Sequence, residues 1–202
     1  ELLATGILNS VSNLFIVPAF IVICRQGLRF EAVTAVFTTL TSCMYHFLEP
    51  IGIPAFGMNA GKWHRLDNIG AITCFSNLFI YLADFGNDAT EEWLKYAFLF
   101  TTIILQEKAP WNVTFTIVPV LSAMALPILR PLLARRWPGY HWRNFTIGVC
   151  LLAFSFILFF IALNERLDYL RCTHALWHVA ISASSFFLWQ SVTRHHDKLH
   201  GL

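Results

Sequence analysis

Seven apolar stretches separated by polar segments are the feature that most limits what this chain can fold into. A helix needs about 20 mostly apolar residues to cross the hydrocarbon core of a bilayer. Charged residues make up 13% of the chain, about half the share typical of soluble domains. The sequence therefore predicts one all-α domain over residues 1–202, a polytopic bundle of seven transmembrane helices. The stretches lie roughly at 3–24, 32–48, 66–83, 94–106, 111–133, 145–163 and 172–192.

The distribution of basic residues predicts the orientation of this bundle. Seven passes place the two ends of the chain on opposite sides of the membrane. The 14 Lys and Arg residues then divide into five on the N-terminal side and nine on the other. The positive-inside rule puts the N-terminus outside or in a lumen and the C-terminus in the cytosol, in the plasma membrane or a secretory-pathway membrane. A net charge of +2, with no basic arm, gives no indication of a nucleic-acid partner.

Polar residues with helical spacing gather on the N-terminal side of the predicted bundle. His174 and His178 stand four residues apart at the head of the last stretch, so both imidazoles share one helix face and can reach one metal ion. Ser42 and His46 repeat this spacing at the end of the second stretch, and Asp67 follows at the start of the third. Ionisable groups at membrane depth are costly and therefore indicate a functional site.

Three neutral imidazoles with one open position are the pattern of a catalytic zinc site. Such a site would use His46, His174 and His178 as ligands, with Asp67 taking a proton from a zinc-bound water and Ser42 supporting the oxyanion. Taken singly, each residue has a simpler interpretation: a hydrogen-bonded histidine, a helix-packing serine, or an acid favoured near a helix N-terminus.

The site depends on whether the stretch at 94–106 crosses the membrane. This stretch is short and contains Lys95. Without it the chain would cross six times, and His46 and His174 would lie at opposite faces. Four nearby groups have open roles. His64 could compete for the site, Glu49 could orient a ligand or face solvent, and Glu165 and Asp168 could pair with the arginines beside them or cover the site's mouth.

The combination of Ser42-x3-His46, Asp67 and His174-x3-His178 resembles one superfamily of membrane proteins. It contains alkaline ceramidases, adiponectin-receptor-type proteins, and a branch with myomaker and the GPI-anchor phospholipase known as post-GPI-attachment factor six. The run from Glu165 to His178 looks most like that last branch. The resemblance implies a seven-helix bundle that binds zinc through the three histidines, with Asp67 and Ser42 handling the water. Its hydrolase members cleave lipid amides or esters.

We therefore expect a zinc-dependent hydrolase of a membrane lipid amide or ester, with its site near the exoplasmic leaflet. The expected partners are the bilayer and a lipid substrate or ligand. One alternative is a myomaker-like protein of membrane fusion or remodelling, without enzymatic activity, in which zinc is structural. A second alternative is a seven-span receptor in which a ligand changes the helix positions.

Overall fold

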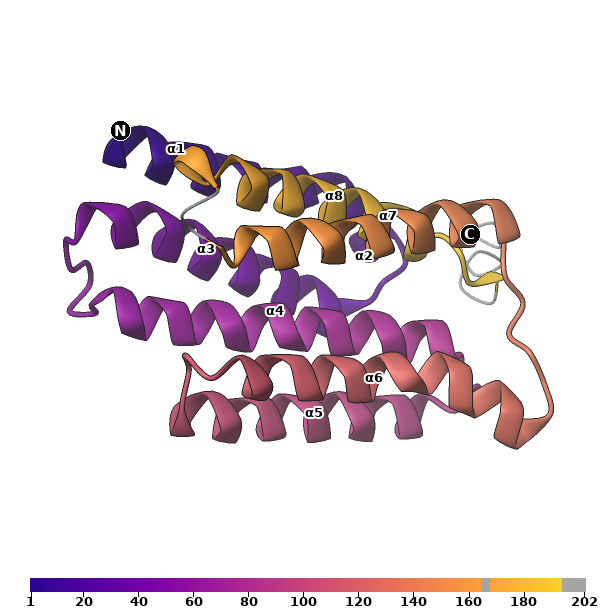
Figure 1. Ribbon diagram of the computed structural model, residues 1–202. Helices are drawn as coiled ribbons and strands as arrows, with labels where there is room; N and C mark the ends of the chain where they lie inside the picture. Colours follow the sequence, from indigo (N-terminus) through magenta and orange to yellow (C-terminus); the bar gives the residue numbers. More distant parts are fainter. Residues whose placement is uncertain (165–167, 194–202) are drawn as a thin grey trace.

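The computed structural model describes residues 1–164 and 168–193, and within these ranges the chain is helical without a strand. The helices form an elongated antiparallel bundle, with Glu1 at one end (Figure 1). In chain order they are α1 (Leu2–Ser12), η1 (Asn13–Ile16), α2 (Val17–Arg25), α3 (Arg29–Ile51), α4 (Ala60–Ala83), α5 (Asp88–Lys108), α6 (Val113–Ala134), α7 (Trp142–Ala162), η2 (Tyr169–Arg171) and α8 (Cys172–Leu188). The all-α prediction is confirmed.

The first three helical elements form one apolar pass, Leu2–Arg25, that tightens briefly into a 3₁₀ turn. Pro18 follows this turn and has no N–H to donate to the carbonyl of Leu14, four residues earlier. That carbonyl instead accepts from the N–H of Val17, which is the spacing of a 3₁₀ helix. The change from α-helix to 3₁₀ helix begins directly after Ser12.

Asparagine side chains begin three of the helices. Asn59, Asn87 and Asn112 each accept backbone N–H bonds in the first turn of α4, α5 and α6. Such caps satisfy donors that a helix start leaves without a partner. The C-terminal end of α3 is capped by Gly52, whose φ of 73° lies in the left-handed region that glycine enters readily.

Four of the described helices are long and apolar enough to cross a membrane: Leu2–Arg25, Ala60–Ala83, Val113–Ala134 and Trp142–Ala162. These apolar helices support an integral, multi-pass membrane protein. The fourth predicted stretch, 94–106, was too short, because it lies within α5, a helix of 21 residues. The predicted stretch began too late because the first turn of α5 contains the acidic residues Asp88 and Glu91, which lower the hydropathy there.

Charges that lower the hydropathy of α3 and α5 neutralise each other. Glu31 of α3 is buried, with 3% of its side chain exposed, and forms an ion pair with Lys95 of α5. An acid and a base at membrane depth are tolerated when they pair. The pair therefore removes the objection that Lys95 raised against α5 as a full pass of the bundle.

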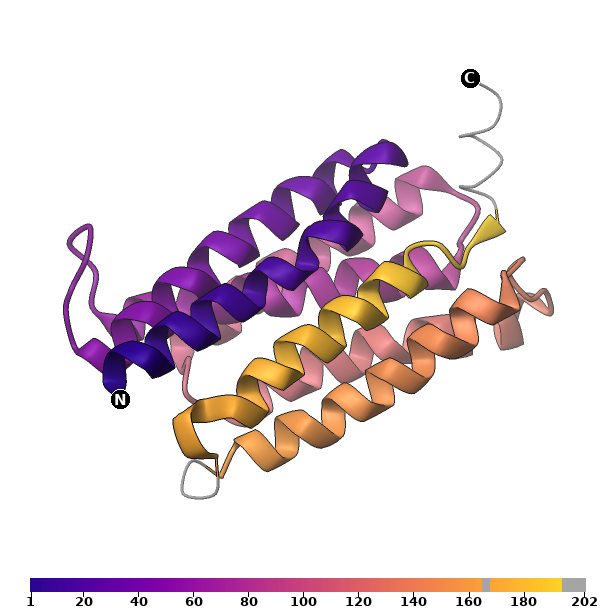
Figure 2. The same cartoon turned by 90° about the horizontal axis from the view of Figure 1, so that it is seen from above.

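The helices pack as a curved row in which the passes alternate in direction (Figure 2). Along this row α7 contacts α8, α8 contacts η1 and α1, α1 contacts α3, and α3 contacts α4, which also packs against α5 and α6. The α4 helix is the most enclosed of the four apolar passes, with 61% of its apolar window buried. The alternation brings the end of α3, the start of α4 and the start of α8 to the same end of the bundle (Figure 1).

Hydrogen bonds to backbone carbonyls tie the opposite end of the bundle together. The Trp189 carbonyl accepts from the Tyr81 hydroxyl at 2.8 Å and from Gln26 Nε2 at 2.6 Å. The hydroxyl of Tyr140, in the loop before α7, donates to the Leu82 carbonyl at 2.6 Å. Burial raises the pKa of Tyr140 to about 12, so this phenol remains a donor at neutral pH. The first two bonds hold the end of α8 against α4 and α2, and the third holds the loop before α7 against α4.

α3 packs closely on α4 at Gly70, and this contact generates a stability prediction. A Cβ built at Gly70 would lie 2.9 Å from the Thr38 Cα and 2.6 Å from its Oγ1. We expect Gly70→Ala to destabilise the bundle by about 1–3 kcal/mol, the usual cost of overpacking. Gly61→Ala in the same helix is the control, because its Cβ would meet only Asn59 Oδ1 at 3.7 Å. Thermal unfolding in detergent measures both, and equal melting temperatures would contradict the prediction.

Candidate metal centre

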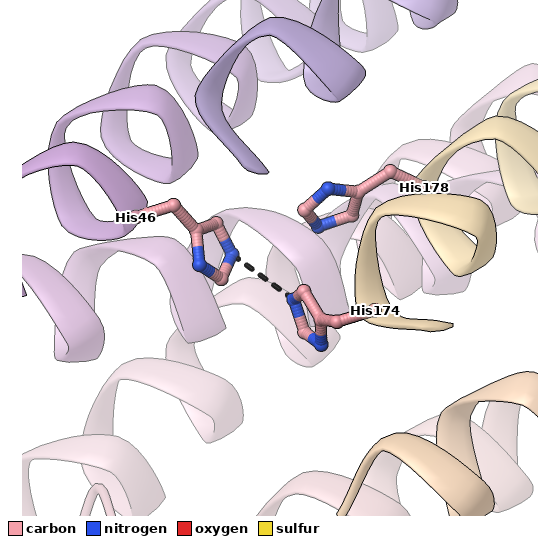
Figure 3. A group of neighbouring side chains, drawn as sticks. All are labelled: His46, His174 and His178. Atoms are coloured by element: carbon pink, nitrogen blue, oxygen red, sulfur yellow. Dashed lines mark hydrogen bonds between the residues drawn. The ribbon is translucent and has the colours of Figure 1, made fainter. Parts of the chain in front are cut away.

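Three histidines from two helices converge between α3 and α8. His46 lies five residues before the end of α3, while His174 and His178 lie in the first two turns of α8. Their rings point toward one another across the gap between the two helices (Figure 3). His46 and His178 are each only 4% exposed. The predicted i, i+4 pair on α8 therefore shares one face, and that face meets α3.

The distances within this triad suit a shared cation. One ring nitrogen from each histidine lies within 4.8 Å of the others. His174 Nε2 and His46 Nε2 are 3.3 Å apart. A tetrahedral zinc ion bound at about 2.0–2.1 Å would hold its ligand nitrogens about 3.3 Å apart. The three histidines could hold a metal ion.

The tautomer of His178 is set by a serine that sequence analysis missed. Ser12 Oγ lies 2.7 Å from His178 Nδ1 and also donates its own proton to the Asn9 carbonyl at 2.8 Å. A serine has one hydroxyl proton, so with that proton on the Asn9 carbonyl the Ser12 oxygen accepts from a His178 Nδ1–H, and this tautomer leaves the Nε2 lone pair for a metal. Asn9 and Ser12 are polar interruptions, three residues apart, of the first apolar stretch. These polar residues at membrane depth were the sequence signal that could have placed Ser12 in the site.

The start of α8 is fixed by Asp168. Its carboxylate accepts from the Thr173 N–H at 2.6 Å and from the His174 N–H at 3.0 Å. Before the helix, Leu170 and Arg171 have φ values of 52° and 53°, a left-handed turn that non-glycine residues adopt at a cost. Asp168 therefore caps α8 and orients the backbone that presents His174.

The arginine beside this turn pairs with the acid at the end of α3. Arg171 contacts Glu49 through both terminal nitrogens, at 3.1 and 3.2 Å. Of the two predictions for Glu49, orienting a ligand or facing solvent, the second fits better, because its side chain is 26% exposed, and its carboxylate also links α3 to η2 through Arg171. Glu165 and Arg166, the other members of the predicted ion-pair group, lie outside the described residues.

Asp67 reaches the triad from α4. Its Oδ2 lies 3.8 Å from His46 Nε2, and the buried Ser42, one helical turn before His46 on α3, lines a cavity that Asp67 also lines. The structure thus brings Ser42 and Asp67 to the histidines, as predicted from the shared depth. Their catalytic roles stay predictions. His64 does not join the metal group, since its ring stacks on Trp111 with centroids 3.7 Å apart.

The triad lies at one end of a partly open cavity of about 570 Å³. Cavities of about 300–1,000 Å³ hold small ligands. Its wall near the histidines includes Asp67 and Ser42, and the wall beyond them is apolar. Residues of that apolar wall include Ile72, Phe75, Leu121, Met124, Phe156 and Ile181. The arrangement combines a polar centre with space for a hydrocarbon chain.

Comparison with known proteins assigns the chain to a family. Residues 1–179 match the family described as "Protein of unknown function (DUF3522)", and the chain belongs to that family. The matched region includes His46, Asp67, His174 and His178, so the whole cluster lies within the family's own domain. No curated protein matches the chain.

The hydrogen bond between Ser12 and His178 generates a prediction about metal affinity. Removing a group that orients a metal-binding histidine typically weakens binding about 10–100-fold. We expect this loss for Ser12→Ala, measured by competition with a chromogenic zinc chelator. Ser10→Ala is the matched control, because Ser10 lies on the same helix and donates to the Cys43 carbonyl instead. Equal affinities in the two variants would show that Ser12 does not orient His178 for metal binding.

Proposed function

We propose that this chain is a zinc-dependent hydrolase that cleaves an amide or ester of a membrane lipid near the exoplasmic leaflet. One observation supports it most: three inward-facing imidazoles and a carboxylate lie at the polar end of an apolar cavity. The resemblance of this residue set to the ceramidase and adiponectin-receptor superfamily, and to the branch with the GPI phospholipase, points to the same chemistry. The substrate class is a lipid whose acyl chain occupies the cavity.

The chain's own residues divide the work between binding and proton transfer. Bound zinc would supply Lewis acidity, which brings the pKa of a coordinated water towards about 7. His46, His174 and His178 would hold the ion. Asp67, 3.8 Å from His46 Nε2, would accept a proton on its carboxylate. The Ser42 hydroxyl would orient that carboxylate or donate to a developing oxyanion.

Seven membrane passes with the N-terminus outside would put this site on the exoplasmic side. The charge pair Glu31–Lys95 supports α3 and α5 as passes, because each residue neutralises the other inside the bundle. The α8 helix, the shortest of the α-helices from α3 onward, has 17 residues and begins at the site. The excess of basic residues at the opposite end favours a cytosolic location for that end.

A second candidate is a membrane fusion or remodelling protein in which the metal is structural. The observation that favours it is the position of the triad. His46 and His178 are buried, and their ring centroids lie 4.9 Å apart, which brings α3 against α8, two helices far apart in the sequence. A metal there would stabilise the bundle by joining them. The two candidates differ in what Asp67 does.

The metal proposal predicts the zinc content of the purified protein. We expect about one zinc per chain by inductively coupled plasma mass spectrometry, since three imidazoles with one open position bind one ion. The double variant His174→Ala/His178→Ala should lose it. His195→Ala/His196→Ala is the control for adventitious binding. A zinc-free wild type, folded and purified without chelators, would rule out the catalytic zinc site.

The hydrolase proposal predicts a separation of turnover from metal binding at Asp67. Asp67→Asn removes the proton acceptor and keeps the shape, so we expect release of fatty acid from a panel of lipid amides and esters to fall about 10²–10⁴-fold. Zinc content should stay unchanged. Glu107→Gln is the control, because this acid pairs with Arg65 near the same end of the bundle. A wild type that binds zinc but releases no fatty acid would favour the structural role.

A further inference from the structure

The cavity ends in a second polar group, remote from the histidines. Glu31, Asn77 and Trp189 line this inner end. Glu31 lies 15 positions before His46 on α3, which corresponds to about 22 Å along a helix. Asn77 lies ten positions after Asp67 on α4, about 15 Å away. The apolar wall of the cavity lies between the two polar ends, so a bound chain would meet polar groups at both of its termini.

Asn77 presents an acceptor that nothing in the described chain satisfies. The residue is 1% exposed. Its Nδ2 donates to Thr34 Oγ1 at 3.3 Å, while Oδ1 has no hydrogen-bond partner. The orientation of the amide follows from Thr34, whose hydroxyl proton already goes to the Phe30 carbonyl and leaves its oxygen as an acceptor. Buried polar atoms are normally paired, so the free Oδ1 indicates a ligand or a water.

The charges at the inner end of the cavity favour a ligand group that is an uncharged hydrogen-bond donor. Glu31 contributes a second acceptor to the cavity wall, but Lys95 neutralises its charge from α5. A cationic group would find no net negative charge there, and an anionic group would face two acceptors. A hydroxyl or an amide N–H can donate to Asn77 Oδ1 without a charge to desolvate.

We propose that the inner end of the cavity is a binding subsite for a neutral hydrogen-bond donor at the far end of the lipid chain, with a hydroxyl as the simplest case. The inference deepens the proposed function, and it rests on that function only for what the other end of the ligand does at the histidines. The cavity therefore distinguishes a chain with a terminal hydroxyl from a plain acyl chain.

A competition experiment tests the subsite without any turnover. The detergent-purified protein is incubated with an equimolar mixture of palmitate and ω-hydroxypalmitate, and the ratio bound is measured by mass spectrometry after removal of the free acids. One buried neutral hydrogen bond predicts a preference of about fivefold for the hydroxylated acid in the wild type. Asn77→Leu, which keeps the volume and removes the acceptor, should bring the ratio to about one.

Ser76→Ala is the matched control. Ser76 is buried beside Asn77 in the sequence but bonds the Ile72 carbonyl and does not line the cavity, so this variant should keep the wild-type ratio. If Asn77→Leu lowers the melting temperature more than Ser76→Ala does, Asn77→Ala is used in place of Asn77→Leu. A wild-type ratio of one or less, a ratio unchanged by loss of the amide, or binding of neither acid overturns the subsite.

The outcome is separable from that of the hydrolase proposal. A preference for the hydroxylated acid without any lipid hydrolysis supports the subsite and counts against the proposed enzyme. Hydrolysis of lipids without such a preference overturns the subsite alone. A preference that persists in Asn77→Leu would show that the hydroxyl is bound elsewhere or by water only.

Discussion

The structure depends on the meeting of His46 and His174, two imidazoles 128 positions apart whose Nε2 atoms lie 3.3 Å from each other. Two neutral histidines gain little from this contact alone, and burial removes both from water. The contact is possible because four helices lie between them, an even number that returns the chain to the same end of the bundle. Every intervening helix must therefore run the full length, including α5 with its lysine.

Paired polar groups make this geometry compatible with an apolar environment. Lys95 is neutralised by Glu31, and Arg171 by Glu49. The backbone N–H groups at the start of α8 are satisfied by Asp168. Burying an unpaired charge or donor is costly, so each partner removes a penalty that would otherwise open the bundle. The polar groups left without partners, such as Asn77 Oδ1, then stand out as places where a ligand can bind.

The cavity and the metal centre are two consequences of the same packing. α7 packs on α8, and α8 packs on the first pass, whereas α5 and α6 pack on α4. The space between these groups is the cavity, with the histidines at one end. The first pass contributes more than a wall, because Ser12 holds His178 in the tautomer that directs Nε2 inward. The largely apolar cavity and the candidate metal ligands thus share the same helices.

The sequence by itself determined the helical class, the membrane environment and the residue types of the centre. Long apolar runs and i, i+4 spacing are local properties, and His174 with His178 could be placed on one face from spacing alone. Only the tertiary structure decided that α5 runs from Asp88 to Lys108, that His64 stacks on Trp111 and does not join the metal group, and that Ser12 and Asp168 contact His178 and the backbone of His174. These contacts join segments far apart in the chain or depend on backbone turns, so no local pattern encodes them. The unsatisfied Asn77 belongs to the same class, because a missing partner is visible only when all its neighbours are in place.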